Sequence, residues 1–177
     1  MHDHQKAKSI RVLLSDVDGI LTDGRLWFDR SGEELKSFHV RDGLGIQLWR
    51  QAGFRTAWIS GRDGLVVRQR AEALGVDAVR LGVHDKLSVA RQLIDQWGVT
   101  LEEVCYIGDD LPDLPLLQEV LLPVTVADAP IEIRQACHWV LQQKGGQGAI
   151  RELVERLLRA KGCWSSLVSA YLPERTP

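Results

Sequence analysis

LLSDVDGILTDG, residues 13–24, places three aspartates directly after an apolar run. Residues 10–14 are too few for a helix and rich in branched side chains, so they predict a buried strand. Asp16 and Asp18 are two residues apart, and on an extended backbone their side chains point the same way. Two carboxylates about 4 Å apart repel by about 4 kcal/mol at an effective dielectric of about 20. The pattern therefore predicts a compensating cation, and Mg²⁺ suits such hard oxygen ligands.

The composition is that of an ordinary globular domain. The chain has 177 residues, of which 45% are hydrophobic and 26% charged, and this fits one folded core. A formal charge of -2 argues against a general attraction to nucleic acid or anionic membranes, so local charges would have to hold an anionic substrate. The three cysteines form no CxxC pair, and neither a secretory signal nor a membrane-spanning run is recognisable. We expect a soluble protein of the cytoplasm.

Short apolar strands alternate with helical patterns along the chain. Helical spacing of apolar residues occurs in 64–74 and 87–97 and is most regular from Ile150 to Leu158. This alternation predicts an α/β fold of the Rossmann-like, doubly wound type, with a mostly parallel sheet and helices on both faces. The further strands are predicted at residues 54–59, 104–107, 123–126 and 138–141.

One segment departs from the alternation and resembles a small β-hairpin. Residues 25–40 contain a turn signal near Ser31 and Gly32. The first arm, residues 26–28, is apolar without alternation, which indicates that both its faces are covered. Either Trp27 packs on the core of its own chain or the arm contacts another subunit, and the sequence leaves both possibilities open.

We expect a single domain at residues 1–161 and a C-terminal tail at 162–177. Within the domain, a hairpin flap at about 24–40 would take the place of a cap domain. The tail is mixed in composition and punctuated by proline, and the sequence leaves open whether it is partly ordered or docks on another subunit.

Chemically suggestive side chains follow the predicted strands. Ligands of open α/β sheets bind beyond the carboxyl ends of the strands, so these side chains are expected to meet there. A carboxylate nucleophile, a second carboxylate two residues on, a hydroxyl, an ammonium and a distal carboxylate are what phosphoryl transfer to an aspartate requires. The residues are Asp16 and Asp18 after the first strand, Ser60 after the second, Lys86 at the start of the 87–97 helix, and Asp109 and Asp110 after 104–107.

The arrangement suggests a role for each group. Asp16 would attack phosphorus, while Asp18 would protonate the leaving alkoxide and then accept a proton from the hydrolytic water. Ser60 and Lys86 would bind the equatorial oxygens, over which negative charge spreads in the transition state.

Other interpretations of the single motifs remain. The DxDG string alone is equally typical of a turn, and a calcium loop fails because its later acidic and glycine positions are not matched. The glycines of KGGQGA, residues 144–149, fit neither a dinucleotide nor a P-loop pattern and are interpreted as a turn into the last helix. His84 and His138 show no ligand spacing and are interpreted as structural.

Together, the motifs resemble those of the haloacid dehalogenase superfamily of phosphatases, in the same order. They are DVDGILTDG (16–24), ISGR (59–62), Lys86 and GDDLPD (108–113). Three further strings are similar to the 3-deoxy-D-manno-octulosonate 8-phosphate phosphatases, a capless branch of that superfamily. They are GEELKSFHVRDGLGI (32–46), VADAP (126–130) and GGQGAIRE (145–152).

The resemblance implies a Mg²⁺-dependent phosphatase that acts through an aspartyl phosphate during synthesis of the lipopolysaccharide inner-core sugar. It also implies a homotetramer in which the hairpin of one subunit closes over the site of its neighbour. The implied metal ligands are Asp16, Asp18 through its main-chain carbonyl, and Asp109, with Asp110 and Asp113 in support. The candidate substrate-binding residues are Thr22, Arg41, Gly61, Arg62 and Arg70.

Substrate choice depends on arginines. A sister branch shares every core motif but acts on a nine-carbon keto-deoxy sugar acid phosphate. Arg62 stands where that branch carries Glu, and Arg41 is absent from it, so both favour the eight-carbon substrate. Arg70 matches a position that binds the sugar carboxylate from an adjoining subunit, a role that suits a guanidinium; on sequence alone it could equally lie on a solvated helix face.

Two functions of other classes compete with that of a phosphatase. A phospho-accepting receiver domain also gathers acidic residues, a hydroxyl and a lysine at a sheet edge. Asp18 argues against it, because a general base at that position would destroy a long-lived phosphoaspartate. A catalytically silent scaffold is not favoured either, since every chemical position is filled.

Overall fold

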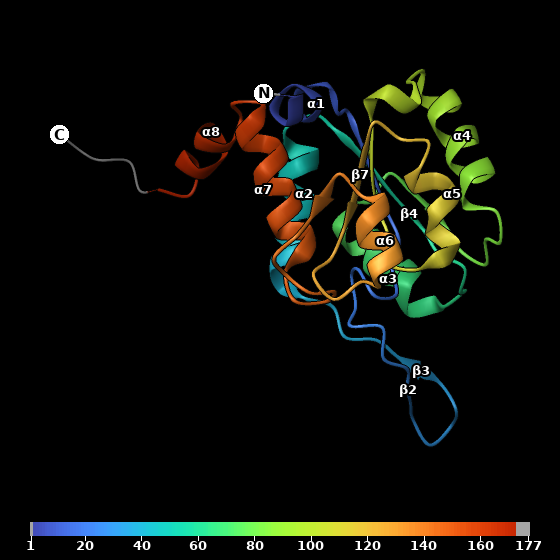
Figure 1. The fold of residues 1–177 in the computed structure, drawn as a ribbon. Coiled ribbons are helices and arrows are strands. Elements are labelled where there is room, and N and C mark those ends of the chain that lie inside the picture. The colour runs from blue at the N-terminus through green and yellow to red at the C-terminus, as the bar shows by residue number, and fades with distance from the viewer. Residues whose placement is uncertain (1, 173–177) are drawn as a thin grey trace.

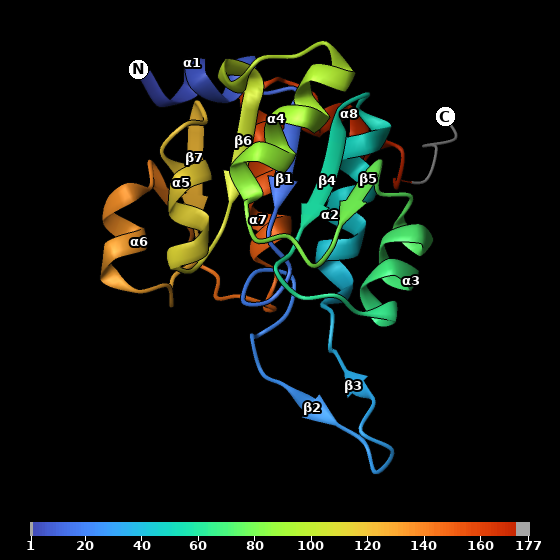
Figure 2. The same cartoon turned by 90° about the vertical axis from the view of Figure 1, so that its right-hand side faces the viewer.

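The computed structural model describes residues 2–172, and its centre is a sheet of six parallel strands (Figure 2). The strand order is β5-β4-β1-β6-β7-β8, so the predicted α/β fold with a mostly parallel sheet is confirmed. Because the chain runs from β1 outward to β5 and then returns to β6, a crevice is expected at the carboxyl ends beside β1. The strands are β1 (Val12–Ser15), β4 (Arg55–Ile59), β5 (Ala78–Arg80), β6 (Val104–Ile107), β7 (Leu122–Thr125) and β8 (Trp139–Val140).

Helices cover both faces of the sheet, as predicted. Figure 1 shows α2 and α7 on one side and α4 and α5 on the other. None of the helices within residues 2–172 is long and apolar enough to cross a membrane. The helices are α1 (His2–Ser9), α2 (Val40–Gln51), α3 (Leu65–Leu74), α4 (Lys86–Trp97), α5 (Leu114–Leu117), α6 (Ile131–Ala136), α7 (Ala149–Ala160) and α8 (Trp164–Ser169), with short 3-10 turns at Leu101–Glu103 and Leu111–Asp113.

Helix α2 was not predicted, and glycine explains why. Gly43 and Gly45 lie inside it and lower its helix propensity. A Cβ on Gly45 would lie 3.2 Å from the Cα of Arg151, so the glycine lets α2 approach α7 closely. Asp42, also on α2, accepts a hydrogen bond from the Arg151 N–H (2.8 Å) and so caps the start of α7, whose own N-cap is Gly148.

The predicted hairpin is present and projects from the body (Figures 1 and 2). Its strands are β2 (Trp27–Phe28) and β3 (Glu34–Leu35), and Gly32 adopts a positive φ of 84° in the turn. Trp27 is 56% exposed and Phe28 60% exposed. The possibility that Trp27 packs on its own core is therefore wrong, because the arm stands away from that core.

The beginning of the predicted tail is helical. Helix α8 packs its Trp164 beneath two cations of α7, with Arg151 at 5.3 Å and Arg159 at 5.0 Å from the ring centroid. Residues 173–177 of the predicted 162–177 tail lie outside the described residues. The division into a domain at 1–161 and a tail stays a prediction.

Candidate active site

The carboxyl ends of the strands bring the predicted reactive groups together. Asp16 directly follows β1, Ser60 follows β4, and Asp109 comes two residues after β6. All three line one cavity of about 460 Å³ together with Asp18 and Lys86. Asp23, the third aspartate of the opening stretch, lies outside this lining and accepts a hydrogen bond from the Arg25 N–H in a turn (3.1 Å).

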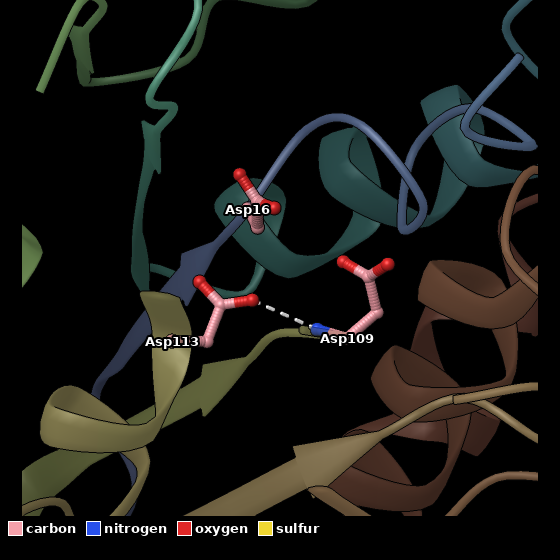
Figure 3. Close-up of side chains that lie close together, drawn as sticks. All are labelled: Asp16, Asp109 and Asp113. Carbon is pink, nitrogen blue, oxygen red and sulfur yellow. Dashed lines mark hydrogen bonds between the residues drawn. The ribbon is translucent and has the colours of Figure 1, made fainter. Parts of the chain in front are cut away.

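Three carboxyl groups form an acidic cluster in this cavity (Figure 3). Asp16, Asp109 and Asp113 each offer an oxygen within 4.8 Å of the others. Asp113 uses its oxygens differently from the other two, because Oδ1 accepts from Lys86 Nζ (2.6 Å) and the Tyr106 hydroxyl (2.5 Å). Its Oδ2 accepts from the N–H groups of Asp109 (2.9 Å) and Asp110 (3.2 Å). Asp113 therefore organises the loop and the lysine.

Burial and mutual repulsion within the cluster raise the pKa values of two of its carboxyl groups. Burial, together with the charge of Asp113, raises the pKa of Asp16 to about 6, although Lys86 opposes the shift. Burial and the neighbouring carboxylates, Asp16 first among them, raise the pKa of Asp109 to about 8. The site without a cation therefore disfavours the charged form of both groups, and at pH 7 the carboxyl of Asp109 is mostly protonated; a bound cation would favour the charged form of both.

Lys86 supplies part of the missing positive charge. Its ammonium lies 2.9 Å from Asp16 Oδ1 and 2.6 Å from Asp113 Oδ1, and its side chain is only 5% exposed. Burial opposes the charged form, but Asp16 and Asp113 outweigh burial and raise the pKa of Lys86. One ammonium does not balance three ionised carboxylates, so a further cation is needed if all three are to be charged together.

The remaining donors fit Mg²⁺. Asp109 Oδ1 is buried and has no hydrogen-bond partner in the part of the chain that the structure describes. Burying such an oxygen without a partner is costly unless an ion binds it. Asp16 and Asp109 are the side chains with oxygens to offer, since Asp113 is occupied by its four donors. The metal-ligand roles of Asp16 and Asp109 are consistent with this geometry. These two roles, and that of the main-chain carbonyl of Asp18, stay predictions.

Gly19 leaves the space that Asp109 fills. It has a positive φ of 92°, and an added Cβ would lie 2.0 Å from Asp109 Oδ2. The glycine in the DxDG string is thus required by its backbone conformation and by its approach to a carboxylate from another strand. Thr22 holds the same loop, because its buried hydroxyl accepts from the N–H groups of Gly19 (3.4 Å) and Gly24 (3.3 Å).

The predicted phosphate-binding loop after β4 also faces the cavity. Ser60 is buried and its hydroxyl oxygen accepts from the Arg62 N–H (3.1 Å). Gly61 and Arg62 line the cavity, and the Arg62 guanidinium lies 3.1 Å from Glu34 of the hairpin. His84 lines the cavity as well, and its interpretation as a structural residue stays a prediction.

Three of the predicted substrate-binding residues do not line this cavity. Thr22 is buried in the loop, and Arg41 is exposed on the first turn of α2. Arg70, on α3, stacks its guanidinium 5.9 Å from the centroid of Phe38. The substrate-binding roles of Thr22 and Arg41 stay predictions, as does the contact of Arg70 with the substrate of an adjoining subunit.

Sequence reasoning missed Lys36, which lies at the base of the hairpin. Its side chain is 1% exposed, and its ammonium contacts Asp18 Oδ1 and lies 3.1 Å from Glu34 Oε1. A lysine in a polar segment carries no local signal for such a contact. Only the path of the hairpin, which returns toward the carboxyl edge of the sheet, brings the lysine there (Figure 2).

A second, larger groove does not have, among the described residues that line it, the groups that an active site of this kind needs. It has a volume of about 880 Å³ and lies at the amino ends of the strands, with Arg11, Phe54 and Lys161 in its lining. Arg11 is already paired with Glu103 at 3.0 Å. The acidic cluster and Ser60 lie at the opposite edge of the sheet, which is where reactive groups of this fold are expected.

Comparison with known proteins agrees with this location. The sequence profile of the haloacid dehalogenase-like hydrolases matches residues 76–153. The chain is 45% identical over 158 residues to the 3-deoxy-D-manno-octulosonate 8-phosphate phosphatase KdsC of Haemophilus influenzae, covering 89% of this chain and 88% of that one. The enzyme of the same name from Escherichia coli K12 is 42% identical, with 89% and 84% covered.

Solved structures of phosphatases from the same group also resemble this chain. The 3-deoxy-D-manno-octulosonate 8-phosphate phosphatase of Moraxella catarrhalis, in complex with a magnesium ion, a phosphate ion and a KDO molecule, superposes with a TM-score of 0.94 at 36% identity. That match covers 97% of this chain and 98% of the other. The cobalt-bound phosphatase of H. influenzae has a TM-score of 0.90 at 44% identity, with 94% and 98% covered. The chain belongs to the 3-deoxy-D-manno-octulosonate 8-phosphate phosphatase family of the haloacid dehalogenase-like hydrolases.

Proposed function

We propose that this protein hydrolyses 3-deoxy-D-manno-octulosonate 8-phosphate to the free sugar acid and phosphate, with Mg²⁺ as its cofactor. The relatives named above support the substrate, and the M. catarrhalis complex holds the same metal and both products. One structural observation carries the proposal. Asp16 and Asp109 share a cavity in which Asp109 keeps a buried oxygen without a partner, while a buried lysine lies beside Asp16.

Asp16 is the nucleophile. Its carboxylate attacks phosphorus, the bond from phosphorus to the sugar oxygen breaks, and the electron pair leaves with that oxygen. Asp18 gives a proton to the leaving oxygen and then takes one from the water that cleaves the aspartyl phosphate. Lys86 and Ser60 hold the phosphoryl oxygens, and the buried position of Lys86 strengthens its attraction to them.

Asp16, Asp109 and the main-chain carbonyl of Asp18 would hold Mg²⁺. The ion supplies positive charge that balances both the carboxylates and the phosphate. Asp113 keeps Lys86 in place and, through its bonds to the N–H groups of Asp109 and Asp110, fixes the loop that carries the metal ligand.

Phosphate release tests this function. The wild-type protein with Mg²⁺ should turn over the octulosonate 8-phosphate many times and the nine-carbon analogue more slowly. Asp16→Asn should fall below about 1% of that rate, because the amide is not a nucleophile. Asp23→Asn is the matched control from the same loop and should keep full activity. Retention of a tenth of the activity by Asp16→Asn would assign the nucleophile elsewhere.

The assembly is proposed as a homotetramer in which the hairpin reaches a neighbouring site. The support is the exposed apolar surface of the hairpin, formed by Leu26, Trp27, Phe28 and Leu35, each 48% to 60% exposed in the single chain. Sedimentation analysis should give four subunits, and Trp27→Ser should shift the protein toward smaller species. A monomer at micromolar concentration would contradict the proposal.

The biological setting follows from the proposed reaction. The reaction would be a step in the synthesis of the lipopolysaccharide inner-core sugar, and a cytoplasmic location stays a prediction. A single catalytic domain at residues 1–161 is proposed on the ground that the cavity and the sheet are built from within it.

A further inference from the structure

Lys36 occupies a position that phosphate binding does not explain. It follows β3 at the base of the hairpin, and lysine side chains are almost never fully buried unless they are paired. Its ammonium contacts Asp18 Oδ1 and lies 3.1 Å from Glu34 Oε1. Lys36 does not belong to the lining of the cavity, so it reaches the reaction through Asp18.

The two oxygens of Asp18 differ as a result. Oδ1 is held by Lys36, whereas Oδ2 has no hydrogen-bond partner among residues 2–172. A group that transfers protons needs a fixed orientation and one oxygen available for the exchange. Asp18 lines the cavity, and Oδ2, which is buried and has no partner among the described residues, is the oxygen left for that exchange.

We infer that Lys36 is a positioning residue for the phosphatase reaction, one that orients Asp18 by holding Oδ1 and leaves Oδ2 to carry the proton. This inference rests on the proposed function. In the first step the proton of Oδ2 goes to the sugar oxygen as its bond to phosphorus breaks. In the second step the attacking water gives a proton to Oδ2 while its oxygen binds phosphorus and the bond to Asp16 breaks.

A purely structural role makes a different prediction. Glu34 contacts both Lys36 and Arg62 at 3.1 Å, so Lys36 also helps to fasten the hairpin to the loop after β4. If fastening were its only task, loss of Lys36 would loosen Arg62 and raise KM for the sugar substrate, and the rate of phosphoenzyme formation at saturation would fall by the same factor for both leaving groups. If Lys36 orients the proton donor, the fall in rate depends on how strongly the leaving group needs a proton.

The experiment compares Lys36→Met with wild type on two substrates. The octulosonate 8-phosphate has an alkoxide leaving group that requires a proton, whereas 4-nitrophenyl phosphate has a phenolate that leaves without one. Phosphoenzyme formation is measured in single-turnover, acid-quench experiments. We expect the sugar substrate to react about 10- to 100-fold more slowly, and the nitrophenyl substrate to slow by less than about threefold. KM for the sugar substrate should change little.

Two variants complete the design. Arg91→Met removes an exposed ion pair with Glu119 outside the cavity and should leave both rates unchanged. Lys36→Arg, which keeps the charge, should recover part of the loss on the sugar substrate. If circular dichroism shows that Lys36→Met does not fold, Lys36→Gln carries the same comparison.

Equal slowing of both substrates, or no slowing of either, would overturn the inference. So would a failure of Lys36→Arg to recover any activity. A wild-type protein that releases no phosphate from the sugar substrate would instead reject the proposed function. The two failures are therefore distinguishable.

Discussion

Asp109→Asn should make the metal-free protein more stable while abolishing its response to Mg²⁺. Burial and the neighbouring carboxylates raise the pKa of Asp109 from an ordinary value of 3.8 to about 8. Because the folded pKa is the higher one, stability is fully present below about pH 3.8 and is lost as the pH rises through about 8. An amide of the same shape removes this loss.

The size of this gain in stability follows from the difference between the pH and the ordinary pKa of an aspartate. At pH 7 the carboxyl of the folded state is mostly protonated, and each of the three or so intervening pH units costs about 1.4 kcal/mol. This sets an upper limit of about 4 kcal/mol, and solvent that reaches the partly exposed side chain reduces it to about 2 kcal/mol. For a chain of this length, that corresponds to a rise in Tm of about 4–8 °C.

Thermal unfolding in EDTA and in Mg²⁺, at several pH values, measures the effect. In EDTA, Asp109→Asn should exceed wild type at pH 7, and the difference should shrink toward pH 4. In Mg²⁺, wild type should gain stability and the variant should not, since binding to the folded state alone is what stabilises. Asp95→Asn, an exposed aspartate on α4, is the control. A variant that is no more stable than wild type in EDTA, or that responds equally to Mg²⁺, would refute the reasoning.

Two further predictions concern the loop and the fold. Gly19→Ala should weaken Mg²⁺ binding at least about tenfold, measured by calorimetry, because its Cβ would meet Asp109 Oδ2 at 2.0 Å and its φ is +92°; the strained backbone alone costs about 1–2 kcal/mol. An unchanged affinity for Mg²⁺ would mean that Asp109 can shift away from the added Cβ and still bind the ion. Asp42→Ala should lower the free energy of unfolding by about 1–2 kcal/mol in urea titrations, because α7 loses its cap. An effect below about 0.3 kcal/mol would show that water replaces this cap.

Much of the site could be predicted because it depends on the order in which strands and helices follow one another along the chain. Asp16 and Asp109 follow two neighbouring strands, β1 and β6, and parallel strands end at one edge, so their proximity follows from the alternation of elements. The regular apolar spacing from Ile150 to Leu158 likewise predicted α7, whose periodic residues are all buried.

Other features could not be predicted, because they depend on contacts between distant segments. Helix α2 contains two glycines and contradicts local propensity, yet it forms because Gly45 lets it pack closely on α7. Strand β5 is only three residues long, Ala78–Arg80, and is recognisable only beside β4. The exposure of Trp27 depends on where the hairpin points, and its apolar sequence does not determine that direction.

The sequence by itself determined which residue types follow the strands, since the succession of elements along the chain and the alternation of side chains on a strand are local properties. Only the tertiary structure decided how each carboxylate is used. Asp113 is occupied by Lys86 and Tyr106, and Asp18 is held by Lys36, while Asp109 keeps an oxygen without a partner. The physical reason is that hydrogen-bond partners and desolvation come from groups far apart in the chain, which only folding brings within a few ångströms of one another.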